Sequence, residues 1–127
     1  MIRDEVVLTL KNKRLAAFAA FIPMVPGDGE NRAIESAKRM SEAGIEGFWD
    51  GKRELGKAYG KVVRLPSRSS IRQSVAWDVY FLYGPDAVWG VTPPKPDFWM
   101  HQLADDSRCL DGAKFRAAVE KALRAID

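Results

Sequence analysis

The chain has 127 residues, of which 46% are hydrophobic and 29% are charged, and its formal net charge at pH 7 is +3. This length and composition fit a single globular domain over residues 1–127 and exclude a chain that is disordered throughout. No apolar run reaches the roughly 20 residues that a membrane-spanning helix needs, and the N-terminus lacks the apolar segment of a secretion signal. We therefore expect a soluble, cytoplasmic protein with no membrane partner.

The chain has one cysteine, Cys109, and one histidine, His101. A single cysteine can form neither an internal disulfide nor a Cys-x-x-Cys pair, and with one histidine it cannot complete a zinc site. We therefore expect no bound metal, no cofactor and no dithiol redox chemistry. The neighbouring Arg108 would favour a thiolate, but an ordinary half-buried thiol is the expectation for this cysteine.

The first part of the chain predicts a helix and then a strand. Apolar residues recur at helical spacing over residues 2–10, with acids near the start and lysines near the end, as the helix dipole prefers. A strand over residues 5–10, where β-branched residues gather, is the alternative. The apolar run 15–22 has the length of a strand covered on both faces, and Pro23 ends it.

The next part predicts a helix, a short strand and another helix. Residues 31–43 place apolar and charged side chains on opposite helical faces, and Gly44 is the expected residue just beyond that helix. Residues 45–49 predict a short strand. Asp50 then has a side chain able to cap a helix that runs from about 52 to 63.

The strongest strand signal lies at residues 75–83, which are rich in β-branched and aromatic side chains. A Gly-Pro-Asp turn follows, so residues 87–90 are predicted as the hairpin partner of this strand. The proline-rich segment 93–96 predicts extended chain. Asp97 is placed to cap a short helical turn over residues 98–103.

The last predicted element is a helix over residues 111–125, whose apolar stripe would dock on the rest of the domain. The expected order is therefore helix, strand, helix, strand, helix, strand, strand, helix. This alternation indicates an α/β fold of two or three layers, with helices around one small mixed sheet.

This order, together with four stretches of sequence, resembles a bacterial group of thioredoxin-like proteins. The stretches are residues 21–24, 48–50, 76–83 and 98–103, and the most specific runs are Trp-Asp-Val-Tyr at 77–80 and Phe-Trp-Met-His-Gln-Leu at 98–103. The resemblance covers most of the chain after residue 14 and implies a reduced thioredoxin-like fold. In the family's common arrangement a first strand and a Cys-x-x-Cys helix come before this part. They have no counterpart here, so the resemblance carries no redox activity over.

The missing first strand has a physical consequence. In a thioredoxin-like sheet that strand is central, so its neighbours would be left with unpaired backbone donors and acceptors. Residues 5–10 could fill the gap as a strand, the sheet could be rearranged, or a second copy of the chain could pair with the open edge. We expect the third arrangement, a homodimer.

The two specific runs supply four candidate ligand-binding residues, which are Trp77, Asp78, Trp99 and His101. The aromatic faces would contact a small molecule or a peptide, and the carboxylate or the imidazole would orient it. An enclosed pocket that holds both Asp78 and His101 would instead indicate an enzyme of unknown class. No recognised nucleophile signature accompanies these two residues, so we expect a chain without catalytic residues.

A basic stretch is the second candidate site. Between residues 51 and 72 the chain carries seven basic residues and one acidic residue, a local excess of +6. The candidate contacts are Lys57, Lys61, Arg64, Arg68 and Arg72. Such side chains would bind the phosphates of a polyanion, but Pro66 is expected to end the helix before they can share one face. The rest of the chain has no nucleic-acid motif, so a solvated helix face and a loop are the expectation.

The sequence thus favours a binding or protein-interaction module over an enzyme. The alternatives are an enzyme that uses Asp78 and His101, and a polyanion-binding protein that uses the basic stretch.

Overall fold

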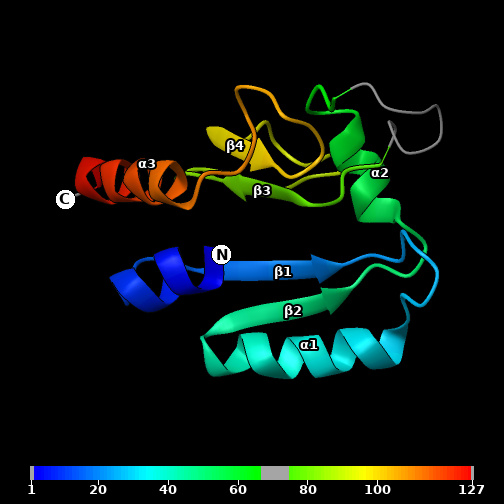
Figure 1. The fold of residues 1–127 in the computed structure, drawn as a ribbon. Helices are drawn as coiled ribbons and strands as arrows, with labels where there is room; N and C mark the ends of the chain where they lie inside the picture. The colour runs from blue at the N-terminus through cyan, green and yellow to red at the C-terminus, as the bar shows by residue number, and fades with distance from the viewer. Residues whose placement is uncertain (1, 67–74, 127) are drawn as a thin grey trace. The chain divides into compact units, whose positions relative to one another are not determined.

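The computed structural model describes residues 2–66 and 75–126 (Figure 1). Its elements follow the predicted order of helix, strand, helix, strand, helix, strand, strand, helix, which confirms the α/β class. They belong to two compact units, one formed by Met1–Lys52 with Gly112–Asp127 and the other by Arg53–Asp111. No helix within the described residues is both long and apolar enough to cross a membrane.

The first unit is built on a parallel strand pair. β1 (Ala17–Phe21) and β2 (Ile45–Trp49) pair residue by residue over their whole length. α1 (Glu30–Glu42) connects them and packs along β2 (Figure 1). The strands confirm those predicted at residues 15–22 and 45–49, and the helix confirms the one predicted from the amphipathic pattern.

Two helices from the ends of the chain complete this unit. η1 (Arg3–Leu8) is a π-helix, and it contacts α3 (Gly112–Ala125), the predicted terminal helix. The helix predicted at residues 2–10 is therefore confirmed, and the alternative strand at 5–10 is wrong. Val6 of η1 is buried, which accounts for the helical spacing of its apolar residues.

Two glycines determine where α1 ends and how closely it packs on β2. Gly44 has a φ of 79°, and it ends α1 as predicted because glycine adopts this left-handed conformation without strain. Gly47 of β2 faces α1 at close range. A Cβ atom placed on it would be 2.9 Å from the Cβ of Ala37. A side chain at residue 47 would thus push α1 away from the strand.

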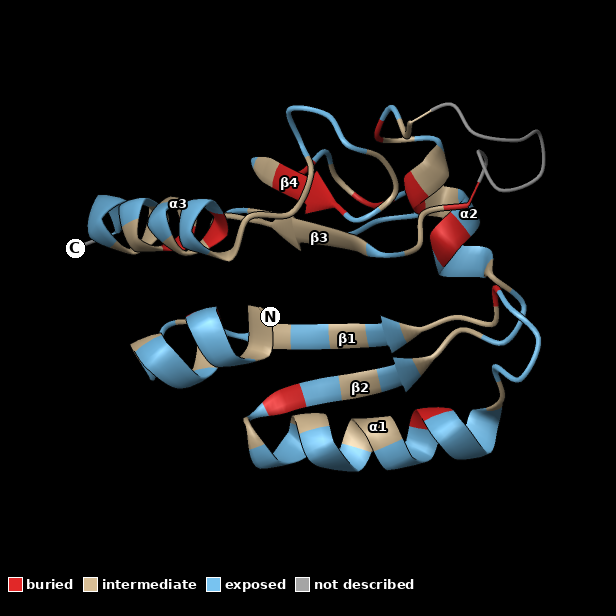
Figure 2. Ribbon diagram, in the orientation of Figure 1, coloured by how far each residue is buried: buried red, intermediate tan, exposed pale blue. Residues whose placement is uncertain are grey.

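The expectation that β1 is covered on both faces is wrong. Burial alternates along the strand between half-buried and exposed residues (Figure 2). Phe18 of β1 is 65% exposed and Phe48 of β2 is 51% exposed, and their ring centroids are 6.3 Å apart. One face of the parallel pair therefore packs on α1, and the other presents an aromatic pair.

The second unit contains a short helix and an antiparallel strand pair. These elements are α2 (Glu54–Gly60), β3 (Val79–Leu82) and β4 (Phe98–His101). In the register of the pair, Val79 lies opposite His101 and Leu82 lies opposite Phe98. Tyr59 of α2 stacks on Phe81 of β3 with a centroid separation of 4.2 Å, which joins the helix to the strand pair.

The helix predicted at 52–63 is shorter than expected and is not capped by Asp50. The backbone N–H of Asp50 instead donates a 2.8 Å hydrogen bond to the carbonyl of Phe21, in line with the end of β1. Arg53 has a left-handed φ of 59°, so helical geometry begins only after it. The helix ends before Pro66, as expected.

The partner of β3 is not the predicted segment 87–90 but β4, where a helical turn over 98–103 was predicted. Both predictions are wrong for one reason: the backbone of the later segment pairs with β3. At one end of the pair the N–H of Gln102 donates to the carbonyl of Asp78 at 2.9 Å. Asp78 has a φ of 50°, so the extended run predicted from residue 75 starts only at Val79.

The loop between β3 and β4 is closed by its own residues. The N–H of Asp97 donates to the carbonyl of Leu82 at 3.0 Å, and the N–H of Gly84 donates to Oδ2 of Asp97 at 2.6 Å. Asp97 therefore closes a hairpin loop instead of capping a helix. The proline segment 93–96 has no regular structure, as expected.

The strands of the described residues form two separate two-stranded sheets, one parallel and one antiparallel. The expectation of one mixed sheet is therefore not met. The parallel and antiparallel pairings are both present, but each stays within its own unit.

Candidate functional site

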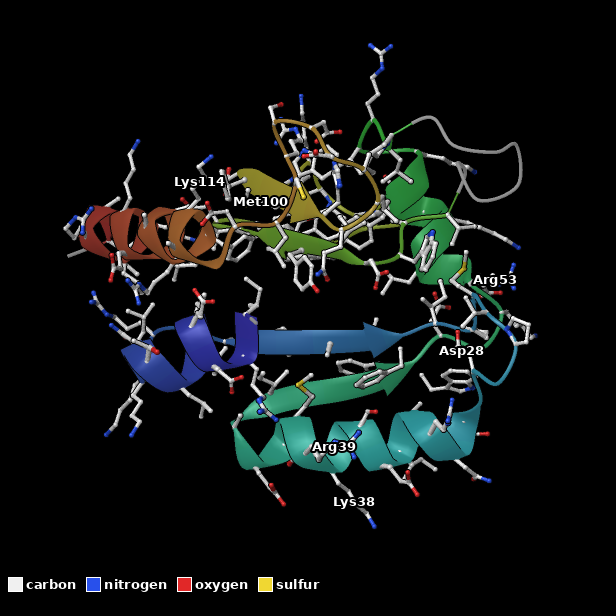
Figure 3. The ribbon with its side chains drawn as sticks, in the orientation of Figure 1. Asp28, Lys38, Arg39, Arg53, Met100 and Lys114 are labelled. Carbon is white, nitrogen blue, oxygen red and sulfur yellow. The ribbon has the colours of Figure 1, made fainter. Side chains whose placement is uncertain are left out.

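The candidate site lies on one face of the β3–β4 pair. Residues directly opposite one another in an antiparallel pair share a face. His101 lies opposite Val79 and Trp99 lies opposite Phe81, so these four side chains share one face. Met100, labelled in Figure 3, belongs to the opposite face of β4.

An open cavity with a volume of about 650 Å³ lies beside this face. Its apolar wall includes Val62, Val63, Leu65, Pro66 and Trp99. Among the described residues, its charged and titratable lining consists of Arg64, Lys95, His101, Asp106 and Arg108. All of these residues belong to the second unit, so the unit builds the cavity by itself.

His101 is the most enclosed residue of the site, with 1% of its surface exposed. Its Nδ1 accepts a 3.1 Å hydrogen bond from the backbone N–H of Leu103, so in the neutral ring the hydrogen is on Nε2. That Nε2 donates to Oδ2 of Asp106 at 3.2 Å and lies 3.0 Å from Oδ1 of the same carboxylate. Both ring nitrogens are therefore engaged inside the protein.

Asp106 and Arg108 extend this contact into a loop with fixed geometry. The other carboxylate oxygen of Asp106, Oδ1, accepts the backbone N–H of Arg108 at 2.8 Å. Nη1 of Arg108 donates to the carbonyl of Trp99 at 3.1 Å, and its guanidinium carbon lies 4.5 Å from the centroid of the Trp99 ring. The Trp99 and His101 rings are 5.8 Å apart. Each side chain of this cluster is thus held by another member or by the backbone.

The four predicted ligand-site residues fall into two groups. Trp99 and His101 lie together in the cavity wall, whereas Trp77 and Asp78 do not line the cavity. The carbonyl of Asp78 accepts the backbone N–H of Gln102, just beyond the paired residues of β3 and β4. The pocket of Asp78 with His101 that the enzyme alternative needs is therefore not formed, and the acid that contacts the imidazole is Asp106.

The carboxylate of Asp78 acts on a different side chain. Burial, and then this carboxylate, raise the pKa of Tyr80 above its usual value. The hydroxyl of Tyr80 donates a 2.6 Å hydrogen bond to Oε1 of Gln102. Asp78, Tyr80 and Gln102 thus form a polar group on the face away from the cavity.

The basic stretch divides between the helix and the cavity. Lys57 belongs to α2, Lys61 follows its last residue, and both are exposed. Arg64 is also exposed and lines the cavity. Arg68 and Arg72 lie outside the described residues. Only one described member of the predicted polyanion site therefore contributes to the cavity.

Three of the cavity's charged residues were not predicted as part of a site: Lys95, Asp106 and Arg108. They come from two loops, and no periodic pattern marks loop residues. The one available signal is the polar turn after β4, in which an acid follows the only histidine by five positions. Cys109, next in the chain, is half-buried as expected.

A hydrogen-bonded aromatic cluster lies elsewhere in the same unit. Nε1 of Trp89 donates to the Tyr59 hydroxyl at 3.1 Å, and the Tyr83 hydroxyl donates to the carbonyl of Pro94 at 2.8 Å. The two hydroxyls are 3.2 Å apart. Because each hydroxyl has one hydrogen, that of Tyr59 points to the Tyr83 oxygen, and a chain of three hydrogen bonds ties the loop between β3 and β4 to α2. Burial raises the pKa of Tyr83 above its usual value.

A second cavity, of about 460 Å³, lies in the first unit beside α1. Its charged lining is balanced: Arg32 and Arg39 are accompanied by Asp28 and Glu35. Figure 3 labels Asp28 in the loop between β1 and α1, and Arg39 on α1. Among the described residues, no group of three or more His, Cys, Asp or Glu side chains is placed to hold a metal ion.

Comparison of the chain with models of protein families finds no match. Comparisons with curated proteins and with solved structures also find none.

Proposed function

We propose that the protein is a binding module whose ligand occupies the open cavity beside β4. The observation that carries this proposal is the wall of the cavity, in which the buried Trp99 and His101 are held in place by Arg108 and Asp106. Apolar and aromatic walls with a few placed polar groups are typical of sites for small molecules and peptides. The volume of about 650 Å³ falls within the usual range of such sites, roughly 300 to 1,000 Å³.

The hydrogen bonds of His101 favour binding over catalysis. A general base needs a free lone pair that can reach a substrate proton, and the lone pair of Nδ1 is used by the Leu103 N–H. The other nitrogen donates to Asp106. The imidazole therefore supports the loop that carries Asp106 and Arg108, and the enzyme that would use Asp78 with His101 is the less favoured alternative.

Blocking the cavity tests the proposal. Ser107 lines the cavity and is exposed, so Ser107→Phe would place a ring in its mouth, whereas Ser41→Phe on the exposed face of α1 is the matched control. A library of small molecules and proline-containing peptides is titrated into labelled protein and followed by NMR. We expect at least one compound to shift the Trp99 indole signal but not that of Trp89, and Ser107→Phe alone to abolish the shift. A library that leaves the Trp99 signal unmoved would refute the proposal.

The thioredoxin-like resemblance is part of the proposal. It is supported by the element order and by the pairing of the two specific runs with each other, in which Tyr80 lies opposite Met100. Because the chain has a single cysteine, we expect the family likeness to be one of fold without dithiol exchange. Purified protein should therefore not catalyse the reduction of insulin disulfides by dithiothreitol, and turnover in that assay would contradict this part.

Self-association of the module is proposed on a different observation. Among the described residues β1 and β2 pair only with each other, so each strand has an unpaired edge, and Phe18 and Phe48 are exposed on their sheet. A second copy that paired with one edge would satisfy these backbone groups and cover the aromatic pair. Size exclusion with light scattering should give twice the mass of the 14.2 kDa chain, and a stable monomer at micromolar concentration would contradict a homodimer.

A further inference from the structure

The cavity beside β4 carries an excess of positive charge. Arg64 follows α2, Lys95 lies in the proline segment, and Arg108 follows β4, yet all three line the same cavity. Asp106 is the one acidic residue among the described lining residues. The cavity in the first unit has as many acids as bases, so the charge excess distinguishes this cavity from that one.

The single carboxylate does not neutralise these cations directly. The Nε2–H of His101 holds Oδ2 of the Asp106 carboxylate at 3.2 Å, and the backbone N–H of Arg108 holds Oδ1 at 2.8 Å. These bonds fix the carboxylate in the loop and leave the guanidinium of Arg108 outside its contacts. Among the described residues, Arg64 and Lys95 make no ion pair and no hydrogen bond.

Arg108 is prepared to receive an anion. Its guanidinium lies over the Trp99 ring at 4.5 Å, and one of its N–H groups donates to the Trp99 carbonyl. Most of the five N–H donors of the guanidinium thus stay available in a fixed plane. A planar fork of this kind matches the two oxygens of a carboxylate or a phosphate, and the loss of side-chain entropy on binding is reduced because the plane is already fixed.

From these contacts we infer that the cavity binds a small organic oxyanion, with Arg108 as the bidentate contact and with Lys95 and Arg64 as additional positive charges. The inference rests on the proposed function and names its ligand class. The apolar residues Val62, Leu65 and Pro66 would contact the carbon part of the ligand. The carboxylate and the phosphate share the chemistry that the three cations recognise.

Calorimetric titration with citrate and with pyrophosphate, in low-salt buffer, tests the inference and separates the two sources of the oxyanion. We expect saturable binding of at least one of them, and weaker binding as salt is added. Arg108→Gln should weaken it by about tenfold and Lys95→Ala by about threefold. Lys57→Ala is the matched control, because Lys57 is an exposed base of the same unit that does not line the cavity, and it should change the affinity by less than about twofold.

The outcomes are distinct from those of the proposed function. Far-UV circular dichroism checks that each variant folds, and Lys95→Ala keeps the test informative if Arg108→Gln does not fold. Failure of both anions to bind in low salt would overturn the inference. A loss of affinity in Lys57→Ala as large as that in Arg108→Gln would also overturn it, because it would show diffuse binding to the charged surface. If only neutral compounds shift the Trp99 indole signal, the binding module stands and the oxyanion inference falls.

Discussion

The backbone N–H of Leu103 donates a 3.1 Å hydrogen bond to Nδ1 of His101, two residues earlier in the chain. This bond fixes the tautomer of a ring that is 1% exposed, and it directs the Nε2–H to Asp106. The loop after β4 is therefore organised around a buried imidazole. Asp106 takes its position from this ring, and the backbone of Arg108 takes its position from Asp106.

Replacement of this imidazole should cost stability. In His101→Phe the part-buried Leu103 N–H loses its acceptor, and a buried polar group left unsatisfied costs about 1–3 kcal/mol. The exposed Asp106 carboxylate also loses the imidazole donor, at a smaller cost because water can replace it. Urea denaturation should show this decrease in the free energy of unfolding. Gln102→Ala, which changes the exposed neighbour, is the control and should cost less. Equal stability of His101→Phe and the parent chain would contradict the supporting role of His101.

A second prediction concerns the contact between α1 and β2. Gly47→Ala would place a methyl group 2.9 Å from the Cβ of Ala37 and 3.4 Å from its Cα, a backbone atom that cannot move without shifting the helix. Overpacking of this kind costs about 1–3 kcal/mol. The measurement is the midpoint of thermal unfolding.

Gly90→Ala is the matched control for this variant, because no heavy atom lies within 4 Å of the added Cβ. The double variant Gly47→Ala with Ala37→Gly should recover part of the lost stability, since it removes the clashing methyl group. If Gly47→Ala unfolded at the same temperature as the parent chain, the close approach of α1 to β2 would be disproved.

Local patterns were sufficient to predict the helices. The helices at residues 2–10, 31–43 and 111–125 each bury part of an apolar stripe. Apolar residues therefore recur in the sequence with the 3.6-residue period of a helix. The strands of the first unit were also predicted, β1 from an apolar run of strand length and β2 as a short strand at residues 45–49. The exposed face of this strand pair was not predicted, because a run of apolar residues does not show which face of a strand is covered by a helix.

Pairing between distant segments could not be predicted from local patterns. Residues 87–90 and 98–103 both contain aromatic side chains, and both follow β3, so propensity alone does not choose between them. The hydrogen bonds of Asp97 and Asp78 decide in favour of β4. The same limit applies to the site, where Asp106 reaches His101 through a turn and not along a helix or a strand.

The chain of hydrogen bonds through two tyrosines gives a third prediction. Tyr59→Phe removes the acceptor of the Trp89 indole and the donor to the Tyr83 hydroxyl, while the stacking on Phe81 is retained. We expect a loss of about 1–2 kcal/mol in the free energy of unfolding. Tyr80→Phe, which removes an exposed hydrogen bond to Gln102, is the control and should cost less. A larger loss of unfolding free energy in Tyr80→Phe than in Tyr59→Phe would show that these hydrogen bonds do not hold the loop between β3 and β4.

The last prediction concerns pH and the turn before α1, where Oδ2 of Asp28 accepts the backbone N–H groups of Met24 at 2.8 Å and Val25 at 2.9 Å. The bond from Val25, and then that from Met24, lower the pKa of Asp28 below its ordinary value of 3.8. A carboxyl whose pKa is lower in the folded chain stabilises the fold above the unfolded value, and this contribution is lost as the pH falls through the folded value. Asp28→Asn should therefore lower the urea midpoint at neutral pH, and its difference from the parent chain should shrink below pH 3.8.

Asp86→Asn, which removes an exposed carboxylate that makes no hydrogen bond among the described residues, is the control. A difference for Asp28→Asn that stayed constant from neutral to acidic pH would show that the charge of this carboxylate does not stabilise the turn.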